Sequence, residues 1–457
     1  MSLMKYILLT LIFLNTLLFV ACSPSKEEAK QPNIIYILAD DLGIGEVGCY
    51  GQTKIKTPHI DRLAQEGMRF TQHYSGASIC APARFTLITG LHIGHSDTYS
   101  QKQRLKPNTQ TLPRLMQEAG YRTGAFGKWG LGDDPNAQGI DDWYGFVDQT
   151  YAHYYYPERI WKNTEQIEIP ENRGLRKDGH YGDISQGVYI HDEFTNNALR
   201  FIDENKEQPF FLYLPYTIPH LEFVVPEDSL NEYLGQWLEK PVPPFKGNFY
   251  DGWGYCAVDA PLAARAAMIT RMDRDIGTIM QRLKELGLDD NTLVIFSSDN
   301  GVLPSKGGND VEFFDGNGPY RETKFTHYEG GLRVPMIARW PGKIQPGSTS
   351  DHISYFPDML PTFTELAGKP ATIPTSGISI LPSLFQKGPQ EQHEFLFFTK
   401  ALRMGDWKLV RENNQDELFN LADDVSETKD LSKQHPEVLA KLVQIWEANQ
   451  ISHPTTD

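Results

Sequence analysis

The chain has 457 residues, 40% of them hydrophobic and 22% charged, which is ordinary for a globular protein. This length exceeds one average domain and predicts one large domain with a smaller one attached. The formal net charge of −16 argues against nucleic acid as a partner, because nucleic-acid-binding domains carry clustered positive charge.

The N-terminus has the pattern of a signal peptide. Lys5 precedes an apolar run over residues 6–20, which is too short for a comfortable transmembrane helix. The run ends in Ala21-Cys22, which resembles a bacterial lipoprotein processing site. We therefore expect residues 1–22 to be a lipoprotein signal peptide, with Cys22 becoming a lipid anchor to the membrane. Ordinary cleavage nearby is the alternative.

Residues 23–32 are polar and rich in Pro, Lys and Glu, so they predict a tether. Within them, Lys26-Glu27-Glu28 resembles the export signal of surface lipoproteins. The expected location is the cell envelope, as a periplasmic or surface-exposed outer-membrane lipoprotein of a Gram-negative bacterium.

Strands and helices alternate along most of the chain. The apolar run 33–39 predicts a strand buried on both faces of a parallel sheet. Further strands are expected over 121–126, 209–214, 292–296 and 334–340, and helices over 58–66, 80–89, 111–119, 192–204, 261–286 and 355–366. The stretches 133–190 and 226–260 read as irregular insertions. This alternation predicts the α/β class with a parallel or mixed sheet flanked by helices.

The C-terminal part has a different pattern. A Pro/Gly/Ser-containing stretch over 369–390 predicts a linker after a domain spanning 33–368. Beyond it, short strands at 395–398 and 407–410, the segment 418–421 and a helix over 436–449 predict a small α+β domain in residues 391–457.

Cys80 is the first candidate for chemistry. Pro82 fits the first turn of a helix, which places Cys80 at the helix N-terminus, where the dipole favours an anion. Arg84 lies about one turn later on the same face. A reactive sulfur beside a cation suggests a site for an oxyanion ester, whereas the alternative is a cysteine buried in a helix cap. This stretch alone leaves both open.

Four predicted strands are followed by polar or charged residues: Asp40-Asp41, Lys128, Pro219-His220 and Asp299-Asn300. Ligands of open α/β sheets bind at the carboxyl ends of the strands, so these residues together predict a site. The aspartates and the asparagine offer only oxygen ligands, which favour Ca²⁺ or Mg²⁺ over zinc.

The segment Cys80-Ala81-Pro82-Ala83-Arg84, followed by Thr89-Gly90, resembles the signature of the type I sulfatases, in particular arylsulfatase-like bacterial carbohydrate sulfatases. The family often has serine where Ala83 stands. The resemblance implies an alkaline-phosphatase-like core. It also implies that a formylglycine-generating maturation enzyme oxidises Cys80 to formylglycine, whose hydrate is the nucleophile.

The resemblance extends to the site residues. It implies metal ligation, usually of Ca²⁺, by Asp40, Asp41, Asp299 and Asn300 together with the modified Cys80. It implies catalytic roles for Arg84, Lys128, His220, which binds the leaving-group oxygen, and Lys324, which contacts the sulfate and precedes Glu329-Gly330-Gly331. Asp416-Glu417-Leu418-Phe419-Asn420-Leu421 resembles the C-terminal segment of the family.

One position departs from the family. Gly130 stands where the family commonly has a histidine that is thought to take a proton from the nucleophile. Lys128, His153 and His327 are the candidates to cover this role. The expected substrate-binding residues are His153, Tyr154, His327 and Arg321.

The predicted function is hydrolysis of sulfate esters on a sulfated saccharide. One alternative is a phosphomonoester or phosphodiester hydrolase of the same superfamily. Another is a glycan-binding lipoprotein that has lost turnover. Cys49 and Cys256 either form a disulfide or are two free buried thiols, and we expect the latter.

Overall fold

The computed structural model describes residues 30–98, 105, 109–132, 134–246, 254–412 and 415–450. Cys22, the expected signal peptide and the tether up to residue 29 lie outside these residues. The chain from Pro32 on forms one compact unit. Within the described ranges, no helix combines the length and apolar character needed to cross a membrane.

A ten-stranded mixed sheet forms the core. Its strands are β1 (Asn33–Ala39), β2 (Met68–Phe70), β4 (Arg122–Lys128), β5 (Asp142–Phe146), β6 (Arg159–Lys162), β7 (Glu165–Glu168), β10 (Phe210–Pro215), β11 (Thr292–Ser298), β12 (Met336–Arg339) and β13 (Ser348–Ser350). Their order is β13-β2-β12-β11-β1-β10-β4-β5-β6-β7. The central strands from β11 to β5 are parallel, and the outer pairs are mostly antiparallel. This confirms the predicted α/β class.

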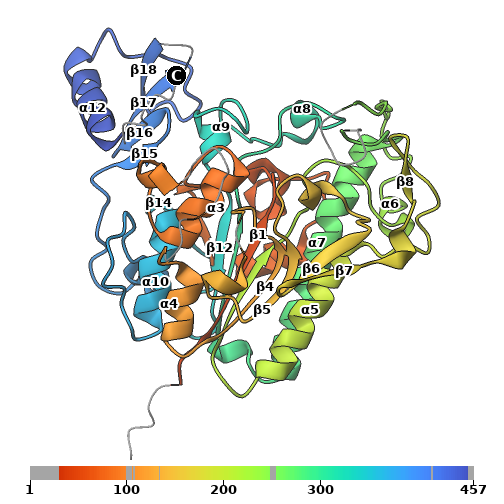
Figure 1. Ribbon diagram of the computed structural model, residues 1–457. Helices are drawn as coiled ribbons and strands as arrows, with labels where there is room; N and C mark the ends of the chain where they lie inside the picture. The colour runs from red at the N-terminus through yellow and green to blue at the C-terminus, as the bar shows by residue number, and fades with distance from the viewer. Residues whose placement is uncertain are drawn as a thin grey trace, which may run out of the picture. The chain divides into compact units, whose positions relative to one another are not determined.

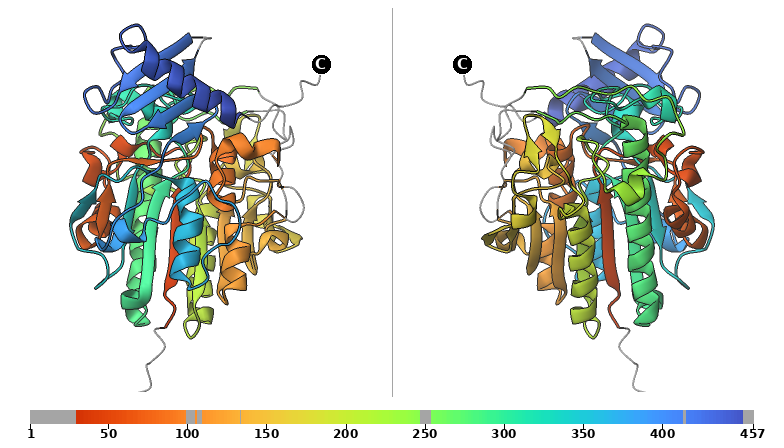
Figure 2. Two further views of the ribbon diagram at one scale, coloured as in Figure 1. Left: turned by 90° about the vertical axis from the view of Figure 1, so that its left-hand side faces the viewer. Right: turned by 90° about the vertical axis from the view of Figure 1, so that its right-hand side faces the viewer.

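Helices cover both faces of the sheet (Figures 1 and 2). One layer contains α2 (Pro58–Glu66), α5 (Ile190–Asn205) and α7 (Pro261–Glu285), and the other contains α3 (Cys80–Thr89), α4 (Leu112–Glu118) and α10 (Met359–Leu366). Successive side chains of β1 alternate between these layers: Ile35 and Ile37 pack in the first, Ile34 and Tyr36 in the second. A strand buried on both faces explains the continuous apolar run in the sequence.

The central strands and the long helices lie within a few residues of their predicted bounds. The stretch 133–190 does not, because it contains β5, β6, β7 and the small hairpin of β8 (Arg176–Lys177) and β9 (His180–Tyr181). These strands have two to five residues, too short to show a periodic pattern. Other short elements are α6 (Glu227–Leu230), α8 (Val311–Phe314) and the pair β3 (His73–Tyr74) and β14 (Ser354–Tyr355).

The C-terminal part is an antiparallel sheet of β15 (Leu396–Phe398), β16 (Ala401–Met404), β17 (Trp407–Glu412) and β18 (Gln415–Asn420), followed by α12 (Pro436–Asn449). This matches the predicted small α+β part. The stretch 369–390 contains α11 (Leu381–Phe385) and is bonded to the core: the Ser376 N–H donates to Gly90 O at 2.8 Å, and the Ile380 N–H to Thr362 Oγ1 at 3.0 Å.

Buried charges join the C-terminal sheet to the core at α9 (Glu329–Leu332). Lys408 Nζ lies 2.8 Å from both Glu329 Oε1 and Glu427 Oε1, and Arg333 Nε donates to Glu329 Oε2 at 2.6 Å. We call these four residues the Lys408 cluster. Burial and the charge of Glu329 raise the pKa of Glu427 to about 7, although Lys408 opposes the shift.

Among the described residues, the two cysteines outside the predicted site form no disulfide. Cys49 and Cys256 are both free, which confirms the preferred expectation. Cys256 is buried as expected, whereas Cys49 is only half-buried.

Candidate active site

The carboxyl ends of neighbouring strands bring the predicted residues together. β11, β1, β10 and β4 lie side by side, and their parallel direction places these ends at one edge of the sheet, at the top of Figure 1. The residues at or just after these ends are Asp40, Asp41, Lys128, His220, Asp299 and Asn300. With Cys80, Arg84 and Lys324 they form what we call the Cys80 cluster. All nine are buried.

Cys80 is the first residue of α3, as the sequence predicts. The preceding loop approaches this helix closely, since a β-carbon on Gly76 would lie 1.7 Å from Thr86 Oγ1. Cys80 Sγ is 3.2 Å from Asp40 Oδ1, to which it donates, and it accepts from Lys324 Nζ at 3.1 Å. Burial raises the pKa of the Cys80 thiol well above its ordinary value, and nearby aspartates raise it further. The unmodified residue is therefore a protonated thiol, which is a poor nucleophile.

Arg84 links two strand ends. Its Nε and Nη2 donate to Asp299 Oδ2 at 3.1 and 2.8 Å, and its Nη1 donates to the carbonyl oxygen of Lys128 at 2.7 Å. Burial and the charge of Asp40 raise the pKa of Asp299 to about 6, although Arg84 opposes the shift. Arg84 thus fixes a guanidinium group beside the N-terminus of α3.

Two lysines pair with two aspartates. Lys128 Nζ lies 2.6 Å from Asp40 Oδ2, and Lys324 Nζ lies 2.6 Å from Asp41 Oδ1. Burial raises the pKa of both carboxyl groups, but these and other nearby cations outweigh it, so both pKa values fall below the ordinary value. Three carboxylates thus face Arg84 and the two lysines, and the formal charges balance.

The cluster offers oxygen ligands for a metal. Ligand atoms of Asp40, Asp41, Cys80 and His220 lie within 4.8 Å of one another. Asp41 Oδ2 and Asn300 Oδ1 are buried and have no hydrogen-bond partner among the described residues. Both Asp299 oxygens accept hydrogen bonds, Oδ1 from the Asp41 N–H and Oδ2 from Arg84. Oxygen donors with free lone pairs fit a hard divalent cation, so these residues suit the implied metal.

Two histidines stack beside the aspartates. His220 Nε2 lies 3.3 Å from Asp41 Oδ2, and the rings of His220 and His153 stack with centroids 3.8 Å apart. His153 Nε2 is 3.5 Å from Lys128 Nζ, and its Nδ1 is 3.2 Å from the Tyr255 hydroxyl. Burial lowers the pKa of His220 to about 4, although Asp41 opposes the shift. His153 is thus placed next to the cluster, as predicted.

The other predicted substrate-binding residues lie elsewhere. His327 Nδ1 is 2.9 Å from Glu412 Oε1, and Arg321 Nη1 donates to the carbonyl oxygen of Glu427 at 2.9 Å. Both contacts are with the C-terminal sheet and the chain after it. The guanidinium carbon of Arg176 lies over the ring of Tyr154, 4.3 Å from the ring centroid. Of the two histidines considered as replacements at Gly130, the structure therefore places only His153 at Lys128.

Gly130 itself adjoins the cluster. Its φ of +75° is in the left-handed region, which glycine adopts without a steric penalty. A β-carbon there would lie 3.3 Å from Arg84 Cδ and 2.9 Å from Gln149 Oε1. Position 130, where the resemblance led us to expect a histidine, is thus beside Arg84 and carries no side chain here.

Sequence reasoning missed a buried ion pair next to Asp41. Arg265, near the start of α7, has its Nε and Nη2 each 2.6 Å from a Glu46 oxygen, and its Nη2 donates to the carbonyl oxygen of Asp41 at 3.1 Å. This contact helps to hold Asp41, whose φ of +65° is unusual for a residue with a side chain. The one sequence feature that could have indicated this ion pair is an arginine within an alanine-rich helical segment.

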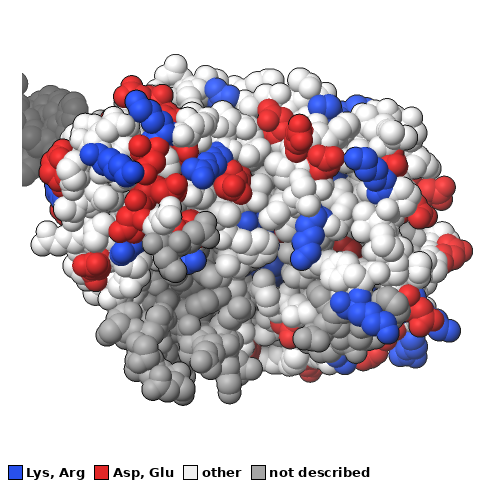
Figure 3. Space-filling model, turned by 90° about the horizontal axis from the view of Figure 1, so that it is seen from above, with Lys and Arg blue, Asp and Glu red and all other residues white. Residues whose placement is uncertain are grey.

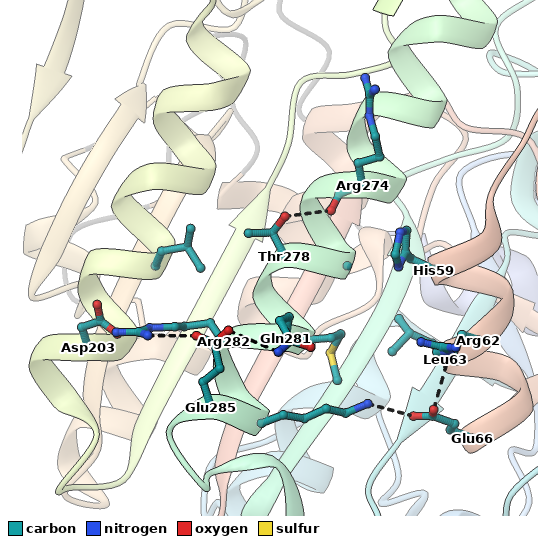
Figure 4. Close-up of a pocket in the computed structure, with 14 residues that line it drawn as sticks. His59, Arg62, Leu63, Glu66, Asp203, Arg274, Thr278, Gln281, Arg282 and Glu285 are labelled. Atoms are coloured by element: carbon teal, nitrogen blue, oxygen red, sulfur yellow. Dashed lines mark hydrogen bonds and ion pairs between the residues drawn. The ribbon is translucent and has the colours of Figure 1, made fainter. Parts of the chain in front are cut away.

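A wide cavity lies away from the cluster. It has a volume of about 670 Å³ and is bounded by α2, α5 and α7 (Figure 4). Charges along it pair with each other: Arg282 Nε lies 2.7 Å from Asp203 Oδ1, and Lys284 Nζ lies 4.0 Å from Glu66 Oε2. It contains none of the predicted catalytic residues. Chemistry, rather than cavity size, therefore identifies the Cys80 cluster as the candidate active site.

Comparison with known proteins gives the family. The model of the sulfatase family matches residues 32–369, and a second model, for the C-terminal part of N-sulphoglucosamine sulphohydrolase, matches residues 320–450. An N-acetylgalactosamine-6-O-sulfatase of Bacteroides thetaiotaomicron is 30% identical and aligns over 92% of this chain and 94% of its own. Human N-acetylgalactosamine-6-sulfatase is 30% identical over 78% of this chain and 66% of its own.

Solved structures give the same answer. The crystal structure of Ps i-CgsB has a TM-score of 0.75 and 29% identity, with 92% of each chain covered, and the same protein has been solved with k-i-k-neocarrahexaose. A phosphonate monoester hydrolase of Agrobacterium radiobacter, at 21% identity and a TM-score of 0.66, shares the fold. These likenesses bear out the alkaline-phosphatase-like core. The chain belongs to the sulfatase family and is a sulfuric ester hydrolase.

Proposed function

We propose that the chain hydrolyses the sulfate ester of a sulfated carbohydrate, using a nucleophile made from Cys80. The observation that carries the proposal is the place of Cys80 Sγ, at a helix N-terminus and within 3.2 Å of both Lys324 Nζ and Asp40 Oδ1. Because the buried thiol is a poor nucleophile, we expect a formylglycine-generating enzyme to oxidise it before the site becomes active. This oxidation converts Cys80 to formylglycine, whose hydrate supplies an oxygen nucleophile.

We assign a divalent metal to Asp40, Asp41, Asp299 and Asn300, with the modified Cys80 as a further ligand. Ca²⁺ is the expected ion and Mg²⁺ the alternative, since both prefer oxygen ligands. A bound divalent ion would supply positive charge that polarises the sulfate oxygens. The buried oxygens of Asp41 and Asn300 that accept no hydrogen bond support the assignment.

The other residues of the cluster would bind the sulfate group and transfer protons. Arg84, Lys128 and Lys324 would hold the sulfate oxygens with charges that are already in place, as transition-state stabilisation requires. His220 would donate a proton to the leaving oxygen. The low pKa of the free histidine opposes this role at neutral pH, but a bound anionic substrate would raise that pKa. His153 is the residue we propose to accept a proton in place of the missing histidine at Gly130.

A carbohydrate substrate is supported by the relatives. Curated relatives are named as N-acetylgalactosamine 6-sulfatases, and a structural neighbour was solved with a carrageenan-type oligosaccharide named in its description. The tyrosines beside His153 do not add to this support, because Tyr154, Tyr155 and Tyr156 are all buried.

The proposal is tested with protein produced together with a maturation enzyme. Mass spectrometry of the Cys80 peptide should show the thiol converted to an aldehyde. Sulfate release from N-acetylgalactosamine 6-sulfate is then compared with phosphate release from N-acetylgalactosamine 6-phosphate. Faster phosphate release would favour a phosphohydrolase. Saccharide binding by the modified protein without sulfate release would favour a glycan-binding lipoprotein.

The metal and the location each have a separate test. Chelation should abolish sulfate release and lower the melting temperature, and Ca²⁺ should restore both, because a ligand that binds only the folded state stabilises it. For the location, we keep the proposal of a lipoprotein in the cell envelope. Cys22→Ala should move the protein out of the membrane fraction, and retention there would contradict the lipid anchor.

A further inference from the structure

Two exposed apolar side chains border the Cys80 cluster. The exposed large apolar residues of the described ranges are Ile79, Leu234, Leu238, Phe245 and Phe325. Ile79 directly precedes Cys80, and Phe325 directly follows Lys324. Since Lys324 Nζ contacts Cys80 Sγ at 3.1 Å, both apolar residues are the chain neighbours of two residues that touch within the Cys80 cluster.

The backbone of Phe325 is held in an unfavourable conformation. Its φ of +78° is in the left-handed region, which costs roughly 1 kcal/mol or more for a residue with a β-carbon. Burial does not offset this cost, because the side chain is 54% exposed. The Phe325 N–H donates to Ser78 O at 3.0 Å, which ties this turn to the loop before Cys80. An exposed aromatic ring at a position suited to glycine calls for a functional explanation.

The ring also lies beside a proposed sulfate-binding charge. Lys324 Nζ is 5.3 Å from the centroid of the Phe325 ring, within the range of a cation–π contact. Ile79, which is 40% exposed, flanks the nucleophile position on the loop that Phe325 contacts. Figure 3 views the face toward which the central strands run, and shows uncharged surface between scattered acidic and basic side chains. Apolar surface thus adjoins the charges that would hold a sulfate group.

We propose that Phe325 and Ile79 form a platform for the sugar ring that carries the sulfate ester. The inference rests on the proposed function and adds where the saccharide is held. A pyranose presents a face of C–H groups and an edge of hydroxyls, so its C–H face can cover an aromatic ring while the sulfate enters the Cys80 cluster. Covering the two side chains removes apolar area from water, which favours binding.

The test separates the sugar from the sulfate. Initial rates are measured for the wild type, Phe325→Ala, Phe325→Gly and the control Leu238→Ala, whose side chain is also exposed. The substrates are N-acetylgalactosamine 6-sulfate and the 4- and 6-sulfates of galactose, and the one that the wild type hydrolyses fastest is used. Inorganic sulfate serves as a competitive inhibitor that has no sugar ring.

We expect both Phe325 variants to raise KM about tenfold with kcat nearly unchanged, as loss of apolar contact predicts. The inhibition constant of inorganic sulfate should stay the same. Leu238→Ala should behave as the wild type. Phe325→Gly should melt at the same temperature as the wild type or higher, because glycine relieves the backbone strain.

Two results would overturn the platform. One is an unchanged KM in Phe325→Gly, and the other is a sulfate inhibition constant that rises in parallel with KM, which would mean that Phe325 acts only by positioning Lys324. Absence of turnover by the modified wild type on all three sugars would instead overturn the proposed function, and the platform with it.

Discussion

The Cys80 cluster and the Lys408 cluster are both buried and both built from carboxylates and cations, yet they are completed in different ways. In the Lys408 cluster, each oxygen of Glu329 and Glu427 lies within 2.8 Å of a nitrogen or hydroxyl donor. In the Cys80 cluster, Asp41 Oδ2 is farther from its neighbouring nitrogen, His220 Nε2, at 3.3 Å, and Asn300 Oδ1 has no hydrogen-bond partner among the described residues.

This difference separates two uses of buried charge. A cluster whose members satisfy each other contributes to structure, and removing one member leaves a buried charge without its partner. A cluster with unpartnered oxygens at the ends of strands is incomplete until a metal or substrate binds. The following substitutions test whether the two clusters really divide in this way.

The largest expected effect is that of Cys80→Ala. Removing the precursor of the nucleophile should lower kcat for sulfate release roughly 10⁴-fold or more, as loss of a nucleophile does in other hydrolases. The melting temperature should change little, because only a neutral thiol is lost. A kcat close to that of the wild type would show that Cys80 does not take part in the reaction.

Lys408→Met tests the structural cluster. The substitution keeps the length of the side chain but leaves Glu329 and Glu427 without their shared cation. The free energy of unfolding should fall by about 3–5 kcal/mol, measured by denaturant titration. Adding Glu427→Gln to the same chain should recover part of the loss. A variant as stable as the wild type would show that the cluster has no structural role.

Lys324→Ala is the matched substitution in the Cys80 cluster. It removes the cation beside Asp41 and Cys80, so kcat/KM should fall roughly 10²- to 10³-fold, in the range seen when one stabilising donor is lost. Stability should change far less than in Lys408→Met, and added Ca²⁺ should still raise the melting temperature. If Lys324→Ala instead unfolds like Lys408→Met, the contrast between the clusters fails.

The smallest expected effect is a change in how the stability of the protein depends on pH, caused by Glu427→Gln. Burial and Glu329 raise the pKa of Glu427 to about 7, so the folded state holds this proton more tightly than the unfolded chain. The contribution of Glu427 to stability is therefore present below about pH 4.5 and is lost as pH rises toward about 7. Melting curves of the variant should lack this decline. An identical decline in both proteins would assign it to other groups.

Local signals explain why much of the fold and site could be predicted. A strand buried on both faces must be apolar throughout, so β1 can be recognised from the sequence. Asp40 and Asp41 can then be placed directly after its end. Pro82 near a helix start locates Cys80. Each of these arguments needs only neighbouring residues, and the strand order then brings the predicted residues together.

The remaining features depend on contacts between distant residues. Arg265 pairs with Glu46, which is 219 positions away, and no local pattern connects them. His327 is only three residues after Lys324, but the chain turns at Phe325 and the histidine pairs with Glu412 instead. Proximity in sequence to Lys324 therefore did not reveal that His327 and Arg321 bond to the C-terminal part of the chain, and their role in substrate binding stays a prediction.

The segment 321–333 also bears on how such proteins can be recombined. It contains Lys324, and yet Arg321, His327 and Glu329 all bond to the C-terminal part of the chain. The family model for that part likewise begins at residue 320, well before the linker region. A chimera joined at residue 369 or later would take Glu329 and Lys408 from different proteins, although the two residues form a buried ion pair. A chimera that keeps these contacts would therefore have to be joined before Arg321, and Lys324 would then come from the same parent as the C-terminal sheet.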